Sequence, residues 1–246
     1  MLEDGPSVVH DVSLAAAVGR RALPIRLCTA FTRSLGAQHA TMSLFPCLEQ
    51  WQLLYASDEC ALRAEAAQFA HADGPSVSAA LEARTVFVPE VRGGDGDRSH
   101  VPDWSDDLPG VRHVLALALH REFRPVGVIC LYFTRPTQLP AAHITEAERA
   151  ADVAREELLR WRPAHADPAG PQPVWATDTR AARWERIHRA AGYVAEREDC
   201  PVGDALAWLQ TASTRRKQSL LDTCDLVLQP AGARPGGHRR APAVAS

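Results

Sequence analysis

The last quarter of the sequence carries cationic side chains at a spacing that suits binding to phosphate groups. One group recurs at every third position and would form a band along a helix, and the other is a run of three in a predicted turn. Guanidinium and ammonium groups bind phosphate oxygens, so both groups predict contacts with phosphates such as those of a nucleic acid backbone. The groups are Arg180, Arg183, Arg186 and Arg189, and Arg215, Arg216 and Lys217.

A solvent-exposed helix face with local ion pairs is the alternative interpretation of these residues. Glu185 lies four positions before Arg189, a spacing at which opposite charges pair on a helix. Asp and Glu are as numerous as Lys and Arg over residues 175–232, whereas tight binding of nucleic acid usually needs an excess of cations. The residues alone therefore leave both interpretations open.

The other chemically reactive residues form no pattern that indicates catalysis or metal binding. The 10 His residues include no HExxH motif, and neither a Gly-x-Ser-x-Gly motif nor a phosphate-binding P-loop is present. The 6 cysteines include no CxxC pair, which predicts buried thiols rather than zinc ligands or disulfides. An acidic loop lacks EF-hand spacing, so we expect a polar surface loop, no metal, no cofactor and no enzyme activity. This loop contains Asp95, Asp97, His100, Asp103, Asp106 and Asp107.

The cationic groups lie in a region that is typical of three short amphipathic helices, 175–198, 202–214 and 219–229. Apolar residues of the first helix recur at alternating steps of three and four, which places them in one seam. Such a seam either pairs two copies of the helix in a dimer or packs against the second helix of the same chain. Ser219 followed by Asp222 predicts a capping box at the third helix. The seam consists of Trp184, Ile187, Ala191 and Val194.

The preceding region combines the alternating apolar pattern of strands with the spacing of helices. Every residue from Val126 to Phe133 is apolar or glycine, which predicts a strand buried on both faces at the centre of a sheet. The whole pattern predicts an α+β fold, with one largely antiparallel sheet and helices packed on it. The expected helices span 24–35, 59–71, 75–83 and 143–161, and the expected strands span 39–45, 51–56, 85–88, 112–120 and 125–134.

Two segments rich in proline and small residues predict boundaries in the chain. Residues 163–174 are expected to form a linker because their prolines disfavour both helix and strand, and residues 232–246 resemble a disordered tail. A net charge of −3 and the lack of a signal peptide or an apolar run of about 20 residues predict a cytoplasmic protein without membrane contact. The expected order is an extension at 1–22, a first domain at 23–162, the linker at 163–174, a helical domain at 175–231 and the tail at 232–246.

The order of these patterns resembles a GAF sensor domain followed by an ANTAR RNA-binding domain, over nearly the whole chain. The likeness of the first domain rests on short matches in the same order, and that of the second on spacing kept across three helices. The first set is Leu27, Cys28, Glu65, Gln68, Phe69, Gly74, Pro75 and the strand 128–132. The second set is Ile187, Ala190 to Gly192, Ala205, Leu206, Leu209 and the stripe from Leu220 to Val227.

The resemblance implies a homodimeric regulator that binds paired hairpins in nascent transcripts and prevents terminator formation. It also implies a cavity for a small molecule between the sheet and the helices of the first domain, although a buried residue in a strand is more often ordinary core than a wall residue. Ala191, Gln210 and Ala212 stand where the family often has polar, cationic or aromatic residues. The expected wall residues are Phe45, Val88, Trp104 and Cys130.

These features predict a signal-responsive antitermination regulator, in which a GAF-like domain senses a ligand or partner and ANTAR-like helices bind hairpin RNA. The alternative is a protein-interaction or dimerisation module whose helices no longer bind RNA. Specific, salt-sensitive binding of hairpin RNA distinguishes the two hypotheses.

Overall fold

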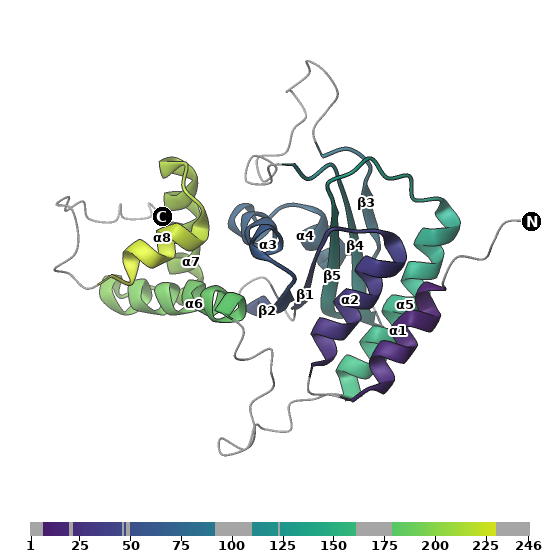
Figure 1. Cartoon of the computed structure of the whole chain (residues 1–246). Helices are drawn as coiled ribbons and strands as arrows, with labels where there is room; N and C mark the ends of the chain where they lie inside the picture. Colours follow the sequence, from purple (N-terminus) through teal and green to yellow (C-terminus); the bar gives the residue numbers. More distant parts are fainter. Residues whose placement is uncertain are drawn as a thin grey trace, which may run out of the picture.

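The structure of the protein, a computed structural model, describes residues 7–19, 22–45, 47, 50–91, 110–122, 124–160 and 179–229 (Figure 1). The expected linker at 163–174, the expected tail at 232–246 and the acidic loop with Trp104 lie outside these residues. No helix within the described ranges combines the length and the apolar character that crossing a lipid bilayer requires.

Five antiparallel strands form one sheet in the order β2-β1-β5-β4-β3. The central strand β5 is the one for which the sequence predicts burial on both faces, and its last seven residues are buried. Gly127 is required where β5 runs beside β1, because a Cβ atom there would lie 2.2 Å from the carbonyl oxygen of Ser43. The strands are β1 (His39–Leu44), β2 (Gln52–Ala56), β3 (Val86–Val88), β4 (His113–Arg121) and β5 (Arg124–Phe133).

Helices cover both faces of the sheet (Figure 1). One face packs against α1 (Val8–Ala17), α2 (Leu23–Leu35) and α5 (Ala141–Arg160). The opposite face packs against α3 (Glu59–His71) and α4 (Pro75–Glu82). The predicted antiparallel sheet with flanking helices is therefore confirmed.

Helix α1 occupies the segment for which we expected an N-terminal extension. Val8 and Val12 are buried against α2 and α5, whereas Leu14 and Val18 face solvent. The segment thus contributes to the core on one face of the sheet, because its apolar residues at positions i and i+4 point the same way.

The C-terminal part contains three helices where three were predicted: α6 (Thr179–Glu198), α7 (Val202–Arg216) and α8 (Leu220–Val227). Ser219 caps α8, since its Oγ accepts a hydrogen bond from the Asp222 backbone N–H at 3.1 Å. Buried residues of all three helices join the core on the α3 side of the sheet in one continuous cluster. The three helices, named here the helical triplet, therefore pack directly onto the sheet domain.

Candidate functional site

An aromatic cluster joins the helical triplet to the sheet domain. The ring centroid of Trp184 on α6 lies 6.0 Å from that of Trp51 and 5.2 Å from that of Phe69. Trp51 and Phe69 meet edge to face at 5.4 Å, an arrangement that aromatic quadrupoles favour. Trp184 is only 1% exposed. Burial of its apolar ring and its contacts with Trp51 and Phe69 make Trp184 an anchor of the triplet on the sheet domain.

Directed hydrogen bonds fix the orientation of this contact. The indole Nε1 of Trp184 donates to the backbone oxygen of Trp51 at 3.0 Å, and Nε2 of His188 lies 2.9 Å from the same oxygen. Gln210 on α7 donates from Nε2 to the backbone oxygen of Phe69 at 2.7 Å. Two helices of the triplet therefore hydrogen-bond to backbone atoms of the sheet domain.

The four seam residues predicted on the first C-terminal helix are all buried within this chain. The sequence offered two packing partners, a second copy or the second helix. Trp184 instead packs against residues of the sheet domain, a partner that neither alternative included. Ile187, Ala191 and Val194 lie in the same core cluster as residues of α7 and α8.

The seven cations predicted to contact RNA do not share one environment, and one of them, Arg180, donates to the backbone oxygen of Ser57. Arg183 NH1 lies 2.5 Å from Glu59 Oε1 on α3 and its NH2 lies 3.9 Å from Asp222 on α8, while Arg186 pairs with Asp225. The other four are exposed, and no ion pair links them to the described residues. These four, named here the basic surface, are Arg189, Arg215, Arg216 and Lys217.

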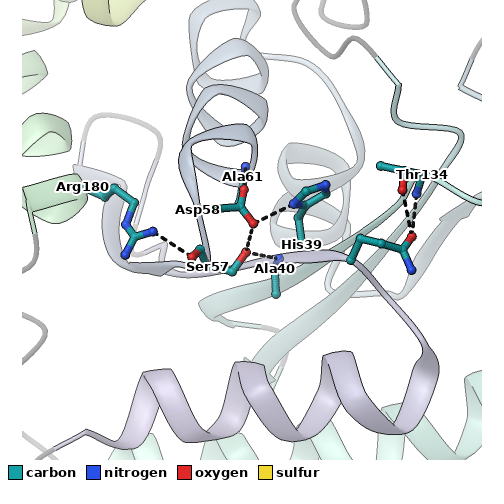
Figure 2. Close-up of polar contacts among 8 residues, drawn as sticks. His39, Ala40, Ser57, Asp58, Ala61, Thr134 and Arg180 are labelled. Carbon is teal, nitrogen blue, oxygen red and sulfur yellow. Dashed lines mark hydrogen bonds and ion pairs between the residues drawn. The ribbon is translucent and has the colours of Figure 1, made fainter.

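A polar group lies at the start of α3, beside the contact with α6 (Figure 2). Asp58 caps α3 by accepting from the Ala61 backbone N–H at 2.9 Å. Its other oxygen lies 2.6 Å from His39 Nδ1 and accepts from Ser57 Oγ at 2.8 Å. Arg180 reaches across from α6 and donates to the backbone oxygen of Ser57 at 2.7 Å.

The surroundings of Asp58 and Cys60 shift the pKa values of both side chains. Burial raises the pKa of Asp58, but hydrogen bonds from His39, the Ala61 amide and Ser57 outweigh burial, so the pKa lies below its ordinary value. Burial, followed by the charge of Asp58, raises the pKa of the nearby Cys60 thiol. Asp58 is therefore held as a carboxylate that accepts three hydrogen bonds.

A second polar network is fully buried between the sheet and helices α3 and α4. The carboxylate of Glu65 accepts hydrogen bonds from four hydroxyl groups, at 2.7 to 3.2 Å. Burial raises the pKa of Glu65, although each of these hydrogen bonds acts to lower it. The four donors are Thr41, Ser43, Ser76 and Tyr132.

Gln68 extends this network by one helical turn. Its Nε2 donates to Tyr132 OH at 3.0 Å, and its Oε1 accepts from the Ser76 backbone N–H at 2.7 Å. Gly74 has φ +123°, and a Cβ there would lie 2.7 Å from the Gln68 side chain. The separate sequence matches Glu65, Gln68 and Gly74 thus meet at one place in the fold.

Three of the four expected wall residues of a small-molecule cavity belong to the core on the α3 side of the sheet or pack against it. Phe45 and Cys130 are fully buried in the core on the α3 side, and Val88 is half-buried. Phe45 packs edge to face on Trp51, and burial raises the pKa of Cys130 to about 12, followed in effect by the charge of Glu65. A hollow of about 350 Å³ opens elsewhere, and it is lined by Glu90, Gly110, Val111, Arg112 and Thr134.

Sequence reasoning singled out Glu65 and Gln68 but missed their partners and the group around Asp58. Thr41 and Ser43 point to the same side of β1, and two hydroxyl residues at positions i and i+2 of a buried strand are a signal for a polar core. The sequence predicts a helix over 59–71 without identifying Asp58, which caps that helix from three positions before Ala61. Its neighbour His39 is 19 residues away in sequence, so only the strand pairing reveals the contact.

Comparison with known proteins gives similarity in structure only. No family model and no curated protein matches the sequence. The structure is similar to a domain of a putative two-component sensor histidine kinase from Sinorhizobium meliloti. The two sequences are 17% identical, the match covers 62% of this chain and 99% of that chain, and the TM-score is 0.46. It is also similar to the GAF domain of an Acinetobacter phosphoenolpyruvate-protein phosphotransferase (11% identity, 70% and 99% coverage, TM-score 0.48). A third similar structure is the GAF domain of a phosphoenolpyruvate-protein phosphotransferase from Coxiella burnetii. Its sequence identity is 6%, the match covers 62% of this chain and 91% of that chain, and the TM-score is 0.46.

Proposed function

We propose that this chain is a signal-responsive transcription antitermination regulator. The sheet domain acts as a GAF-like sensor of a small molecule or a partner, and the helical triplet acts as an ANTAR-like module that binds hairpin RNA as a homodimer. The proposal includes no catalytic step. The observation that carries it is the direct packing of α6 on the sheet domain through Trp184.

This packing supplies a physical connection between sensing and binding. Arg183 pairs at once with Glu59 on α3 and with Asp222 on α8. A movement at the start of α3 would therefore change how far Glu59 neutralises Arg183, and a shift of α6 would move the whole triplet. Because the contact combines apolar burial with directed hydrogen bonds, it favours two discrete arrangements over a gradual one.

The basic surface is the part of the triplet suited to phosphate groups while α6 is docked. Arg215 and Arg216 lie in the last turn of α7, and Lys217 ends the helix with φ +52°. Cations are favoured at a helix C-terminus by the helix dipole. All three side chains are exposed, so their charges are available to the oxygen atoms of a nucleic acid backbone.

The test is binding of a tandem short-loop hairpin RNA to the full chain at about 50 and about 200 mM salt. The triple variant Arg215→Ala, Arg216→Ala, Lys217→Ala should bind at least about tenfold more weakly and reduce the slope of log K against log salt by about 3. The matched control is Arg121→Ala with Arg124→Ala, two exposed cations at the β4–β5 turn. The control should bind as the native chain does.

A protein-interaction module is the second candidate, and one observation favours it. Arg183 and Arg186 are already paired with carboxylates of the same chain, so they add little to the positive charge that the basic surface offers. If the native chain shows no salt-sensitive binding of the hairpin RNA, the RNA proposal is wrong and this candidate stands. Equal loss of binding in the control variant would also contradict a specific basic surface.

A further inference from the structure

We propose that His39, Asp58 and Cys60 form a binding site for a thiophilic divalent metal ion of the Zn²⁺ class. Their ligand atoms, an imidazole nitrogen, a carboxylate oxygen and a thiol sulfur, all lie within 4.8 Å of one another. This site is independent of the proposed RNA binding. Among the described residues, this is the group of His, Cys and Asp side chains whose metal-binding atoms converge from separate segments of the chain.

The strand register explains how residues far apart in sequence converge. β1 and β2 pair antiparallel with Thr41 opposite Ala56. The pairing continues past both strands, because the Ser57 amide donates to the backbone oxygen of Ala40 at 2.9 Å. The next step places His39 opposite Asp58, and α3 begins there.

Helix α3 then supplies the third ligand. Asp58 is its N-cap and Cys60 lies in its first turn, so one short segment contributes two donors on a rigid framework. Asp58 keeps one oxygen on the Ala61 amide at 2.9 Å, which orients the carboxylate and leaves the other oxygen towards His39. Metal sites depend on such outer hydrogen bonds to hold their ligands in place.

The donor set selects the class of ion. Thiolate and imidazole are ligands for zinc and similar transition ions, whereas magnesium and calcium prefer oxygen atoms alone. Three protein ligands with a fourth position open to water is a common zinc arrangement. The side chains of His39 and Asp58 are 21% and 38% exposed, so water and the ion can reach the site.

Binding needs only small movements of side chains. Zinc bonds of about 2.0–2.3 Å place the ligand atoms of a tetrahedral site about 3.3–3.8 Å apart. His39 Nδ1 and Asp58 Oδ2 now lie 2.6 Å apart as a hydrogen-bonded pair, so the ion would replace that hydrogen bond and separate the two atoms slightly. Cys60 would move in from within 4.8 Å.

The site lies beside two contacts between the sheet domain and α6, so a bound metal ion would affect how the helical triplet is held. Arg180 on α6 donates to the backbone oxygen of Ser57 (Figure 2). Arg183 pairs with Glu59, so the residues on either side of Asp58 both contact α6. An ion on Asp58 would place positive charge beside both guanidinium groups, which weakens these contacts by repulsion.

The test is titration of the reduced full chain with Co²⁺, followed by displacement with Zn²⁺. We expect one equivalent of Co²⁺ to give a thiolate-to-metal absorption band, and Zn²⁺ to abolish it. Cys60→Ser should lose the band. Cys47→Ser, at an exposed cysteine in the β1–β2 connection, is the matched control and should keep it.

Two further variants separate ligand loss from loss of fold. Asp58→Asn retains a good helix cap but loses the anionic ligand, and His39→Ala removes the imidazole. Each should weaken Co²⁺ binding at least about tenfold while circular dichroism stays native. A band that survives in Cys60→Ser, or a native chain that gives no band, overturns the site.

Discussion

The two faces of the sheet are built from different kinds of residue. Towards α1, α2 and α5 the buried residues of the sheet are apolar. Towards α3 and α4 the buried set includes Thr41, Ser43 and Glu65 together with Gln68 and Ser76. This second face is also the side on which the helical triplet packs. Apolar packing alone stabilises the first face, whereas the second also depends on hydrogen bonds that need a defined geometry.

This difference indicates which face carries the specific contacts of the molecule. A buried polar group without partners costs about 1–3 kcal/mol, so each member of the Glu65 network constrains the others. The aromatic cluster and the group around Asp58 lie on this same side, at the ends of β2 and α3. Substitutions on the two faces should therefore differ in the size of their effect on stability and also in how that effect depends on geometry and pH.

The largest expected effect follows from Trp184→Ala on the second side. Removal of a buried Trp side chain should lower the free energy of unfolding by about 3–5 kcal/mol, because the rings of Trp51 and Phe69 lose their partner. Urea denaturation followed by circular dichroism measures this loss. Limited trypsin digestion should also show faster cleavage within α6, whose arginines are released.

Trp184→Phe is the control, since it keeps a ring but loses the hydrogen bond to the Trp51 backbone oxygen. It should be intermediate in stability. Phe31→Ala, at a buried residue of α2, should cost a comparable free energy without the faster cleavage in α6. If Trp184→Ala stays within about 0.5 kcal/mol of the native chain, the triplet is not anchored by this residue.

The contrast between the faces also separates what sequence predicts from what it does not. The run Val126 to Phe133 predicted the central strand because burial on both faces leaves a local apolar signature. Ser219 predicted a helix start through local backbone chemistry, and the ends expected for the helix 24–35 coincide with Pro24 in its first turn and Gly36 at its C-cap. Such features depend on neighbours in the chain, so sequence suffices for them.

Contacts between distant segments left weaker signals. Trp184 and the Trp51 backbone oxygen are 133 positions apart, and an apolar seam does not specify which surface will cover it. The sequence therefore predicts a dimer or a helix pair for Trp184, whereas in the structure Trp184 packs on the sheet domain. Similarly, Glu65 and Tyr132 are 67 positions apart, and the hydrogen bond between them depends on sheet register.

The next effect concerns pH and depends on Glu65. Its pKa is raised above the usual 4.5 in the folded protein, so between pH 4.5 and that raised pKa the folded state binds more protons than the unfolded state. The free energy of unfolding should then fall as pH rises through this window, by up to about 1.4 kcal/mol per pH unit. Denaturation of native and Glu65→Gln chains at a series of pH values measures the slope.

Glu65→Gln should lose this slope, so its stability relative to the native chain improves as pH rises. Leu117→Ala on the apolar face is the comparison, because a truncated core leucine should cost about 2–5 kcal/mol at every pH alike. Parallel profiles for native and Glu65→Gln chains would show that the buried carboxylate does not distinguish the two faces in this way.

The smallest expected effect is the loss of the ion pair between Arg183 and Glu59. Their side chains are 30% and 49% exposed, and solvent screening limits exposed pairs to about 0.2–1 kcal/mol. A double-mutant cycle with Arg183→Ala and Glu59→Ala should give a coupling energy in that range, and added salt should reduce it. The pair between Arg155 and Asp152, within helix α5, is the matched control on the other side of the sheet. A coupling energy of several kcal/mol at Arg183 would mean that charge, and not the aromatic cluster, holds the triplet on the sheet domain.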